Sequence, residues 1–517
     1  MKKHIQIFAA SLIFLGILLI GVSLRFYKLG AIPAGFFCDE ASIGYNAYTI
    51  LTQGKDEFGT VFPVFFRAFG EYKGPIEIYS TVPSIAVFGL NEFATRLPSA
   101  LYGTLGLIAI FLLTRELFHT DKNKEMLAFL AMFSLAISPW DIHFSRVALE
   151  GLMPYVFFTT LASYLFLRAQ RNIRFLFPSI LCFALAFYSY FPARLFIPAL
   201  GIGLLIMYRT FLRTHYKHVI FGAILLGYIL LPFFQNFFSD SGLARWNQVS
   251  IFAHPPTTGT TLEHIASSYF QHFSADFLFL KGDIDMPGQF ITRHSVKGFG
   301  ELFFIQLPFI LWAVIEIIRK PTKSGIFLLL WLLLYPLGSM FTLDNTPQAT
   351  RSIIGVIPLQ ILTAMGMVHL IRRLQAVRQY FSDGVIVLTG IAIILSVFTY
   401  TQAYVTHYNA YSSDFWGWQY GARDVMTYFV AHQHEYHDLV LQPEFNAPSI
   451  FLKFYAPQGC PQCSIGQVED KQILGTKQLF ALTPDYLSKH PQYHFKLEHT
   501  VYYPNKSIAF EIGEIVQ

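Results

Sequence analysis

Residues 5–28 read IQIFAASLIFLGILLIGVSLRFYK, an apolar run that ends in a basic and aromatic cluster. A helix rises about 1.5 Å per residue, so the roughly twenty residues before Arg25 can cross the ~30 Å hydrocarbon layer of a membrane. Lys2 and Lys3 ahead of the run are also typical of a secretory signal. Arg25 to Lys28 stand where a signal would carry a small-residue cleavage site, so we predict an uncleaved membrane helix.

The composition of the whole chain is also that of a membrane protein. Of 517 residues, 54% are hydrophobic and 13% are charged, whereas ordinary soluble domains carry about 25% charged residues. This excludes a soluble multi-domain enzyme. It also excludes disordered and coiled-coil classes, which need polar or strictly repeating sequence. The predicted fold class is a polytopic α-helical membrane protein.

Apolar runs of membrane-spanning length recur along the chain, and no internal repeat is visible. We predict about eleven transmembrane helices. Their ranges are 5–24, 97–118, 126–142, 152–167, 175–190, 195–208, 219–238, 302–318, 326–341, 353–371 and 385–404.

Basic residues fit this number of helices, because Lys and Arg concentrate in the cytoplasmic loops of membrane proteins. Every second connection carries a basic cluster, namely Lys2 and Lys3; Arg115, Lys122 and Lys124; Arg168, Arg171 and Arg174; Arg209, Arg213 and Lys217; Arg319, Lys320 and Lys323; and Arg372, Arg373 and Arg378. The formal net charge of +5 therefore indicates topology and not a nucleic-acid partner. We predict a multi-pass protein of the plasma (inner) membrane with its N-terminus inside and its C-terminus outside.

Three regions project outward with enough sequence to form structure of their own. The first outer loop covers 25–96 and the second covers 239–298. Residues 406–517 are polar and alternate short helical and strand-like stretches, which predicts a small extracytoplasmic α/β domain after a membrane domain of residues 1–405. A Gly-rich phosphate loop is absent from the sequence, which disfavours a nucleotide-driven pump.

The first outer loop carries the strongest chemical signal, the pair Asp39-Glu40. Apolar residues recur after it at helical spacing, which predicts an amphipathic helix on the membrane surface. Two carboxylates at a helix N-terminus also suit the positive end of the helix dipole, so a plain charged cap is the simplest alternative. Lys73-Gly74-Pro75 comes some thirty residues later, and Arg96-Leu97-Pro98-Ser99 opens the next span.

This series resembles the GT-C superfamily of membrane glycosyltransferases. It is most similar to glycosyltransferase family 39 and its bacterial relatives, the protein O-mannosyltransferases and lipid A aminoarabinose transferases. The likeness extends through Ser138-Pro139-Trp140 and Ser145-Arg146 with Glu150, and through Thr346-Pro347 with Arg351 and Pro358. It covers about residues 1–370 by order and topology.

The resemblance implies a GT-C fold and a polyprenyl-phosphate sugar as donor. A hexose or pentose would be transferred at the extracytoplasmic face to a hydroxyl of a lipid, glycan or protein. Such a transfer needs a base for the acceptor proton but no strong acid, because a phosphate leaves already ionised. One carboxylate then suffices for an inverting direct displacement, and Asp39 matches the family's catalytic position. Glu40 is expected to orient the acceptor or to support Asp39.

The leaving phosphate needs cations around it. The resemblance assigns this role to Lys73, although the family usually has Lys-Pro without the intervening Gly74. Arg146 and Arg351 are the next candidates, with snorkelling to lipid headgroups as their alternative. Glu150 stands where the family usually has Asp, and it is expected to orient the acceptor or to pair with Arg146. We expect no metal site and no cofactor, since the lipid-linked sugar is a substrate.

Two other functional classes stay open at this point. A non-catalytic lipid or polysaccharide transporter would more often show repeats and ionisable groups near the membrane midplane. An oligosaccharyltransferase-like enzyme is disfavoured because its acceptor and metal motifs are missing. Phe415-Trp416-Gly417-Trp418 is interpreted as interfacial aromatics. Cys460 and Cys463 are interpreted as a short structural disulfide, with a redox or metal role as the alternative.

Overall fold

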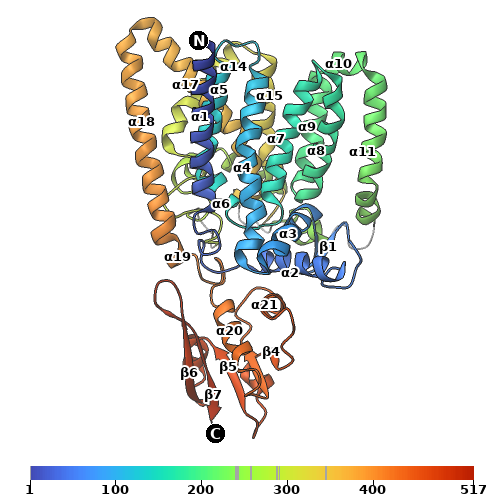
Figure 1. Cartoon of the computed structure of the whole chain (residues 1–517), viewed down its shortest axis with the longest axis vertical. Coiled ribbons are helices and arrows are strands. Elements are labelled where there is room, and N and C mark those ends of the chain that lie inside the picture. The colour runs from blue at the N-terminus through green and yellow to red at the C-terminus, as the bar shows by residue number, and fades with distance from the viewer. Residues whose placement is uncertain are drawn as a thin grey trace.

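A computed structural model of the chain describes residues 2–238, 244–256, 259–286, 289, 291–343 and 346–516, without the side chains of 2–7, 244 and 245. Long apolar helices stand side by side and form the larger part of the molecule (Figure 1). They are α1 (Lys2–Phe26), α4 (Glu92–Leu117), α5 (Lys124–Ala136), α7 (Leu152–Ala169), α8 (Leu176–Ser189), α9 (Ala193–Met207), α11 (Tyr216–Phe237), α14 (Leu307–Arg319), α15 (Lys323–Leu334), α17 (Val356–Val377) and α18 (Gln379–Gln402).

Each of the eleven predicted ranges falls on one of these helices. By length and composition, six apolar helices in the described ranges qualify as membrane spans. The number becomes seven if α5 and α6 (Pro139–Ser145), which are bent by 58°, form one broken span. The chain is therefore a multi-pass helical membrane protein, while the total of eleven spans stays a prediction.

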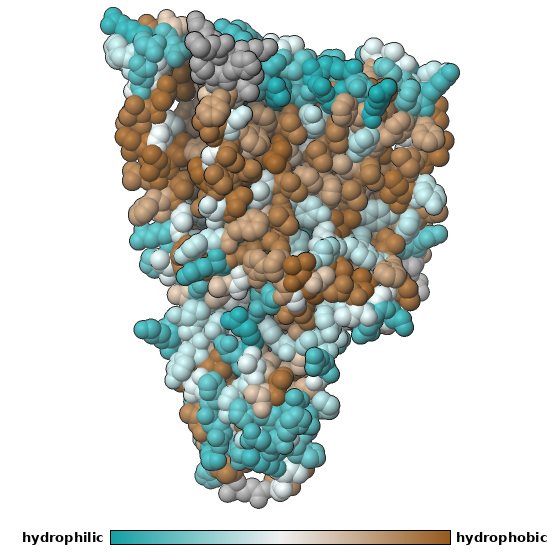
Figure 2. Space-filling model, viewed as in Figure 1, coloured by the Kyte–Doolittle hydropathy of each residue, from teal (hydrophilic) through white to brown (hydrophobic). Residues whose placement is uncertain are grey.

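The helices differ in how much of their surface is buried by the rest of the protein, and this distinguishes central helices from peripheral ones. The buried share of the most apolar 18-residue stretch is 89% in the α16–α17 span. It is only 6% in α11 and in the span that contains α18. Most apolar side chains of α11 and α18 are thus left uncovered by the rest of the protein and suit a lipid environment. These two helices flank the bundle in Figure 1, and a broad apolar band covers the helices on the face shown in Figure 2.

The two ends of the bundle differ. The N-terminus and the basic connections lie at one end, and a polar rim covers that end in Figure 2. At the other end α2 (Cys38–Gln53) and α3 (Pro75–Phe88) lie across the helices, and the C-terminal domain extends beyond them (Figure 1). This arrangement is the one that the alternating basic connections predict, although the side of the membrane on which each end lies stays a prediction.

Shorter elements complete the membrane domain. They are the strands β1 (Phe66–Ala68) and β2 (Glu71–Lys73), the helices α10 (Arg209–Thr214), α12 (Ala244–Val249), α13 (Thr261–Gln271) and α16 (Ala349–Ser352), and the single turns η1 (Ile173–Phe175), η2 (Asp276–Leu280), η3 (Phe304–Gln306), η4 (Tyr335–Gly338) and η5 (Ile353–Gly355). After α18, η6 (Ala403–His407) and α19 (Tyr408–Tyr411) lead toward the C-terminal domain.

The C-terminal domain has a five-stranded sheet in the order β4-β3-β5-β7-β6. The strands β3 (Asp438–Leu441), β4 (Cys463–Ile465) and β5 (Gln478–Leu482) are parallel, and β7 (Ile508–Val516) runs antiparallel to both β5 and β6 (His494–Tyr502). Its helices are α20 (Ala422–His432), α21 (Ser449–Tyr455), α22 (Val468–Lys471) and α23 (Pro484–Lys489). Cys460 and Cys463 form a disulfide at the start of β4.

Topology gives the first test. A reporter fused after Asp414 should be active only on the outer side of the membrane, and one fused at Asn123 only on the inner side, because the basic clusters hold their end of the bundle in the cytoplasm. Paired alkaline phosphatase and green fluorescent protein fusions would measure this. The reverse pattern at either site would place the α2 end of the molecule in the cytoplasm and overturn the predicted orientation.

Candidate functional site

A polar cavity of about 320 Å³ lies where the α2 end of the bundle meets the C-terminal domain. Its walls come from segments that are far apart in the sequence. The lining residues are Phe37, Cys38, Asp39, Phe69, Glu71, Leu149, Glu150, Leu152, Tyr190, Ile291, Arg293, His294, Gln348, Thr350, Arg351 and Asn446. Three residues predicted from the sequence, Asp39, Glu150 and Arg351, therefore share one cavity.

Asp39 stands in the first turn of α2 and forms an ion pair with the ammonium group of Lys73. Burial by itself lowers the pKa of Lys73, but the charges of Asp39, Glu150 and Glu71 outweigh this effect and raise it above its usual range. The ammonium group therefore stays protonated at neutral pH. Lys73 is nearly buried while Asp39 keeps some exposure on the cavity side.

The hairpin of β1 and β2 explains how Lys73 reaches this position. Its strands pair Phe66 with Lys73 and Ala68 with Glu71, and the turn residues Phe69 and Gly70 both have positive φ, as a tight two-residue turn requires. Alternate residues of a strand point to the same face, so Glu71 and Lys73 are both directed inward and are both buried.

Gly74, which interrupts the family's usual Lys-Pro pattern, has a steric reason. A Cβ atom on Gly74 would lie 2.1 Å from the carbonyl oxygen of Tyr188, and one on Gly151 would lie 2.2 Å from that of Ser189. Real Cβ atoms do not approach backbone atoms so closely. The C-terminal end of α8 therefore packs directly against the segments that carry Lys73 and Glu150.

Glu150 also lines the cavity, from the short connection between α6 and α7. Its φ of 49° lies in the left-handed region, and Gly151 follows with a φ of 80°. Two successive residues of this kind reverse the chain tightly, which brings Glu150 to the surface of the cavity instead of into the bundle.

Arg351 comes from α16, and a buried polar network fixes that short helix. The carboxylate of Asp283 accepts hydrogen bonds from the backbone N–H of Ala349 at 2.8 Å and from Nδ1 of His294 at 3.0 Å. The indole of Trp140 donates to the carbonyl of Ala349 at 2.9 Å. This places Gln348, Thr350 and Arg351 along the cavity wall, with Arg351 largely buried.

Arg293 is a cavity cation that the sequence analysis missed. Its guanidinium stacks over the ring of Phe37 at 3.9 Å and donates to the carbonyl of Trp416 at 2.9 Å. Nε2 of His143 donates to the backbone carbonyl of Arg293 at 2.7 Å. Burial lowers the pKa of Arg293, and the charge of Asp39 acts most strongly in the opposite sense.

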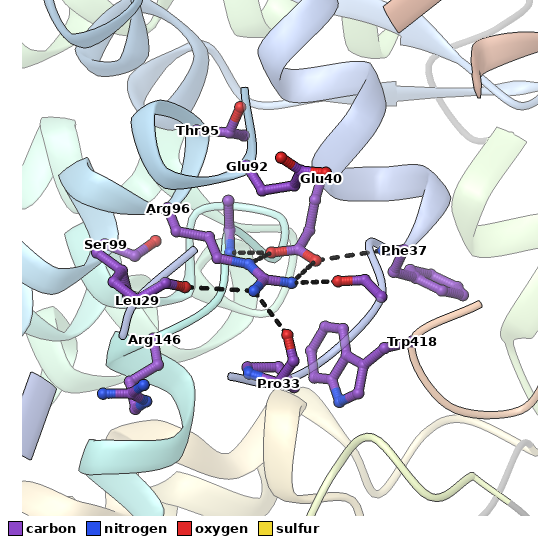
Figure 3. Close-up of polar contacts among 12 residues, drawn as sticks. Leu29, Pro33, Phe37, Glu40, Glu92, Thr95, Arg96, Ser99, Arg146 and Trp418 are labelled. Atoms are coloured by element: carbon purple, nitrogen blue, oxygen red, sulfur yellow. Dashed lines mark hydrogen bonds and ion pairs between the residues drawn. The ribbon is translucent and has the colours of Figure 1, made fainter. Parts of the chain in front are cut away.

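Glu40 lies beside the cavity but does not line it. Its carboxylate accepts two hydrogen bonds from Arg96, at 2.8 and 2.9 Å, and both side chains are completely buried (Figure 3). The backbone N–H groups of Ala148 and Phe37 donate to the same carboxylate at 3.1 and 3.2 Å. Arg96 in turn donates to the carbonyl oxygens of the loop before α2, those of Leu29, Pro33 and Gly35.

Arg146, a predicted phosphate ligand, also lies outside the cavity lining. Its terminal nitrogens donate to the carbonyl oxygens of Leu24, Tyr27 and Ile32 at 2.8, 2.6 and 3.0 Å. Carbonyls at a helix C-terminus lack partners within the helix, and Arg146 supplies partners at the end of α1. In this structure Arg146 positions the loop before α2, instead of facing Glu150 or a ligand in the cavity.

The aromatic segment of residues 415–418, near the start of the C-terminal domain, also differs from its interpretation. Trp418 is completely buried, donates to the hydroxyl of Tyr408 at 2.8 Å, and lies over the guanidinium of Arg96. Only Phe415 and Trp416 are exposed as interfacial residues would be. Tertiary contacts of this kind leave no local sequence signal, because Arg96 is more than three hundred residues away.

The sequence thus identified part of the cavity. Asp39 and Lys73 were found because they match the family's Asp-Glu and Lys-Pro positions in the first outer loop. Glu150 and Arg351 were found because they follow recognisable Ser-Arg and Thr-Pro patterns. Arg293 and Asn446 were missed, although Thr292-Arg293-His294 is a polar triplet shortly before an apolar run. Among the described residues, no group of three or more His, Cys, Asp or Glu side chains has the arrangement of a metal site. The functional roles of the predicted residues stay predictions.

Comparisons with known proteins agree with this architecture. The family model for dolichyl-phosphate-mannose-protein mannosyltransferases matches residues 73–233. No curated protein matches the chain. The crystal structure of ArnT from Cupriavidus metallidurans in the apo state has 13% identity and a TM-score of 0.61, covering 99% of this chain and 98% of that one.

Two further structures contain a lipid phosphate. ArnT from Cupriavidus metallidurans bound to undecaprenyl phosphate has 12% identity and a TM-score of 0.60, covering 97% of this chain and 98% of that one. The archaeal oligosaccharyltransferase AglB from Archaeoglobus fulgidus, in complex with an inhibitory peptide and a dolichol-phosphate, has 14% identity and a TM-score of 0.55. The match covers 98% of this chain and 74% of the AglB chain.

The resemblance to GT-C glycosyltransferases of the mannosyltransferase and aminoarabinose transferase kind is therefore confirmed. At 12–14% identity, the structural likeness establishes a shared fold over nearly the whole chain. The fold class is that of a GT-C membrane protein.

The buried pair of Glu40 and Arg96 gives the second test. Glu40→Gln leaves the Arg96 charge uncompensated in a dry environment, which should cost about 3–5 kcal/mol of stability. Glu125→Gln is the matched control, because its pair with Arg115 is about half exposed and should be worth about 1 kcal/mol or less. Thermal unfolding of the purified variants in lipid nanodiscs would measure both. Equal melting temperatures would show that the buried pair does not hold α2 in place.

Proposed function

We propose that this protein is a membrane glycosyltransferase that moves a monosaccharide, a hexose or pentose, from a polyprenyl-phosphate donor to an acceptor hydroxyl. The reaction takes place at the extracytoplasmic face of the plasma membrane. The observation that carries the proposal is the cavity in which one carboxylate, Asp39, lies beside Lys73 and shares the walls with Arg293 and Arg351. A base next to several cations is the arrangement that transfer from a lipid phosphate needs.

Asp39 is the proposed base. Its oxygen takes the proton of the acceptor hydroxyl while the acceptor oxygen forms a bond to the anomeric carbon. The bond between that carbon and the phosphate oxygen breaks, and its electron pair stays on the phosphate. Polyprenyl phosphate leaves already ionised, so the step needs no acid. A single displacement inverts the anomeric configuration, and the proton on Asp39 passes to water afterwards.

Lys73, Arg293 and Arg351 are the proposed phosphate ligands, with Arg293 taking the place first assigned to Arg146. The leaving phosphate gains negative charge as the bond breaks, and fixed cations at the site stabilise that charge more than they stabilise the donor. Lys73 already pairs with Asp39, so it can connect the base and the phosphate. Glu150, on the same cavity wall, is the proposed acceptor-orienting carboxylate.

Substitution of the base tests the mechanism. Asp39→Asn keeps the size of the side chain but cannot take a proton at neutral pH, so transfer should fall by on the order of 10²–10⁴ while undecaprenyl phosphate still binds. Purified protein in nanodiscs, radiolabelled polyprenyl-phosphate sugars and a set of candidate acceptors would give the rates. Asp485→Asn, an exposed carboxylate of the C-terminal domain, is the control. Wild-type turnover in Asp39→Asn would move the base elsewhere, with Glu150 as the next candidate.

Substitution of the cation tests the donor site. Lys73→Ala removes one charge-assisted contact, which should weaken binding of undecaprenyl phosphate by on the order of 1.5–3 kcal/mol. Lys73→Arg keeps the charge and should retain part of that affinity. Binding can be measured by native mass spectrometry on protein extracted in detergent. If Lys73→Ala binds the lipid phosphate as well as wild type does, the role belongs to Arg293 or Arg351.

A further inference from the structure

One wall of the cavity comes from the C-terminal domain. Asn446 lies in the loop of residues 442–448, which connects β3 to α21, and it lines the same cavity as Asp39. Its side chain is exposed. The segments before the C-terminal domain contribute the other lining residues, so this loop is the part of the C-terminal domain that reaches the site.

Packing fixes the loop that carries Asn446. The ring of Phe445 is buried and contacts the rings of Phe510 and Phe451 at centroid distances of 5.3 and 5.2 Å. Gln442 donates to the carboxylate of Glu444 at 2.8 Å and accepts from the backbone N–H of Thr483 at 2.7 Å. Asn446 is therefore presented from a rigid base.

The helix that follows the loop fixes its position relative to Asp39. In α21, the ring of Phe454 contacts Phe36 at 4.8 Å, and the ammonium of Lys453 pairs with Glu57 at 2.8 Å. A Cβ atom on Gly44 of α2 would lie 2.6 Å from the Phe454 ring, so α2 and α21 are in close contact. Asp39 lies in the first turn of α2 and Asn446 precedes α21, so the contact between the two helices sets the spacing of both residues.

From this geometry we infer that Asn446 binds the acceptor, and that the acceptor group next to the base is a saccharide. An amide offers two donors and an acceptor without charge, which suits neighbouring sugar hydroxyls. The cavity wall also carries the uncharged polar groups of Gln348 and Thr350 and the partly exposed ring of Phe69. Aromatic faces attract the C–H edges of a sugar ring, because they carry the negative side of the ring quadrupole.

The strand next to Asn446 argues against a peptide at this place. Extended peptides commonly bind by adding to a free strand edge. The strand β3, which leads into the loop, is already paired on one side with β4 and on the other with β5. The loop therefore offers a side chain to the cavity and not a strand edge. This inference rests on the proposed transfer to an acceptor hydroxyl, and it adds the class of acceptor.

Binding and transfer are measured separately in the test. The full-length protein in lipid nanodiscs is titrated with methyl glycosides of common hexoses and pentoses, and with a short Ser/Thr-containing peptide, by saturation-transfer NMR. Asn446→Ala should weaken glycoside binding roughly five- to tenfold through loss of its hydrogen bonds. Asn446→Gln should restore part of the affinity, and undecaprenyl phosphate should bind both variants as it binds wild type. Gln492→Ala, an exposed amide of the same domain outside the cavity lining, is the control.

Each outcome has a defined meaning. Glycoside binding that depends on Asn446 and not on Gln492 supports the inference. If wild type transfers no sugar from a lipid-phosphate donor but shows this binding pattern, the acceptor site stands and the proposed reaction fails. Equal glycoside binding by Asn446→Ala and wild type overturns the inference. Binding of the peptide in place of the glycosides overturns it as well, and so does an absence of binding by either probe.

Discussion

The ion pair between Arg96 and Glu40 is the contact on which the rest of the site depends. Two charges without access to water are stable together only if their remaining hydrogen-bonding capacity is filled. Here the Arg96 guanidinium holds three carbonyls of the loop before α2, and Glu40 holds the backbone of Phe37 and Ala148. A single pair thus joins α4, the start of α2 and the connection that leads to Glu150. Asp39, next to Glu40 in α2, takes its position from this arrangement.

The charged residues at this end of the molecule separate into two groups. Arg96 with Glu40, and Arg25 with Asp141, are buried. Arg96 also binds carbonyls of the loop before α2, and Arg25 binds carbonyls at the end of α5. Asp39, Glu150 and the cavity arginines instead keep a face toward open space. The first group is held in one geometry because any other would leave a buried charge unpaired. The second group retains the capacity to bind a phosphate or to accept a proton.

The C-terminal domain is tied to the site at several points. Trp418 packs over Arg96, the carbonyl of Trp416 accepts from Arg293, and the hydroxyl of Tyr455 donates to Glu92 of α4 at 2.9 Å. The same domain supplies Asn446 to the cavity wall. A change in how this domain packs would therefore move one cation of the cavity and the proposed acceptor contact together.

The sequence by itself determined the features that depend on neighbouring residues. The length of an apolar run decides whether a helix can cross a membrane, and the charges in the connections decide its orientation, so the helices and the place of Asp39 between the first two runs could be read directly. Tertiary structure decided which charges face the cavity. Asp39 and Glu40 are adjacent, but their side chains diverge by about 100° on a helix, so one reaches the cavity and the other reaches Arg96. Arg146 likewise fits the pattern of a phosphate ligand, yet the unpaired carbonyls at the end of α1 bind it. Arg293 joins the site through contacts with residues more than a hundred positions away, and Asn446 lines a cavity together with residues of the membrane domain. No local pattern encodes such a meeting.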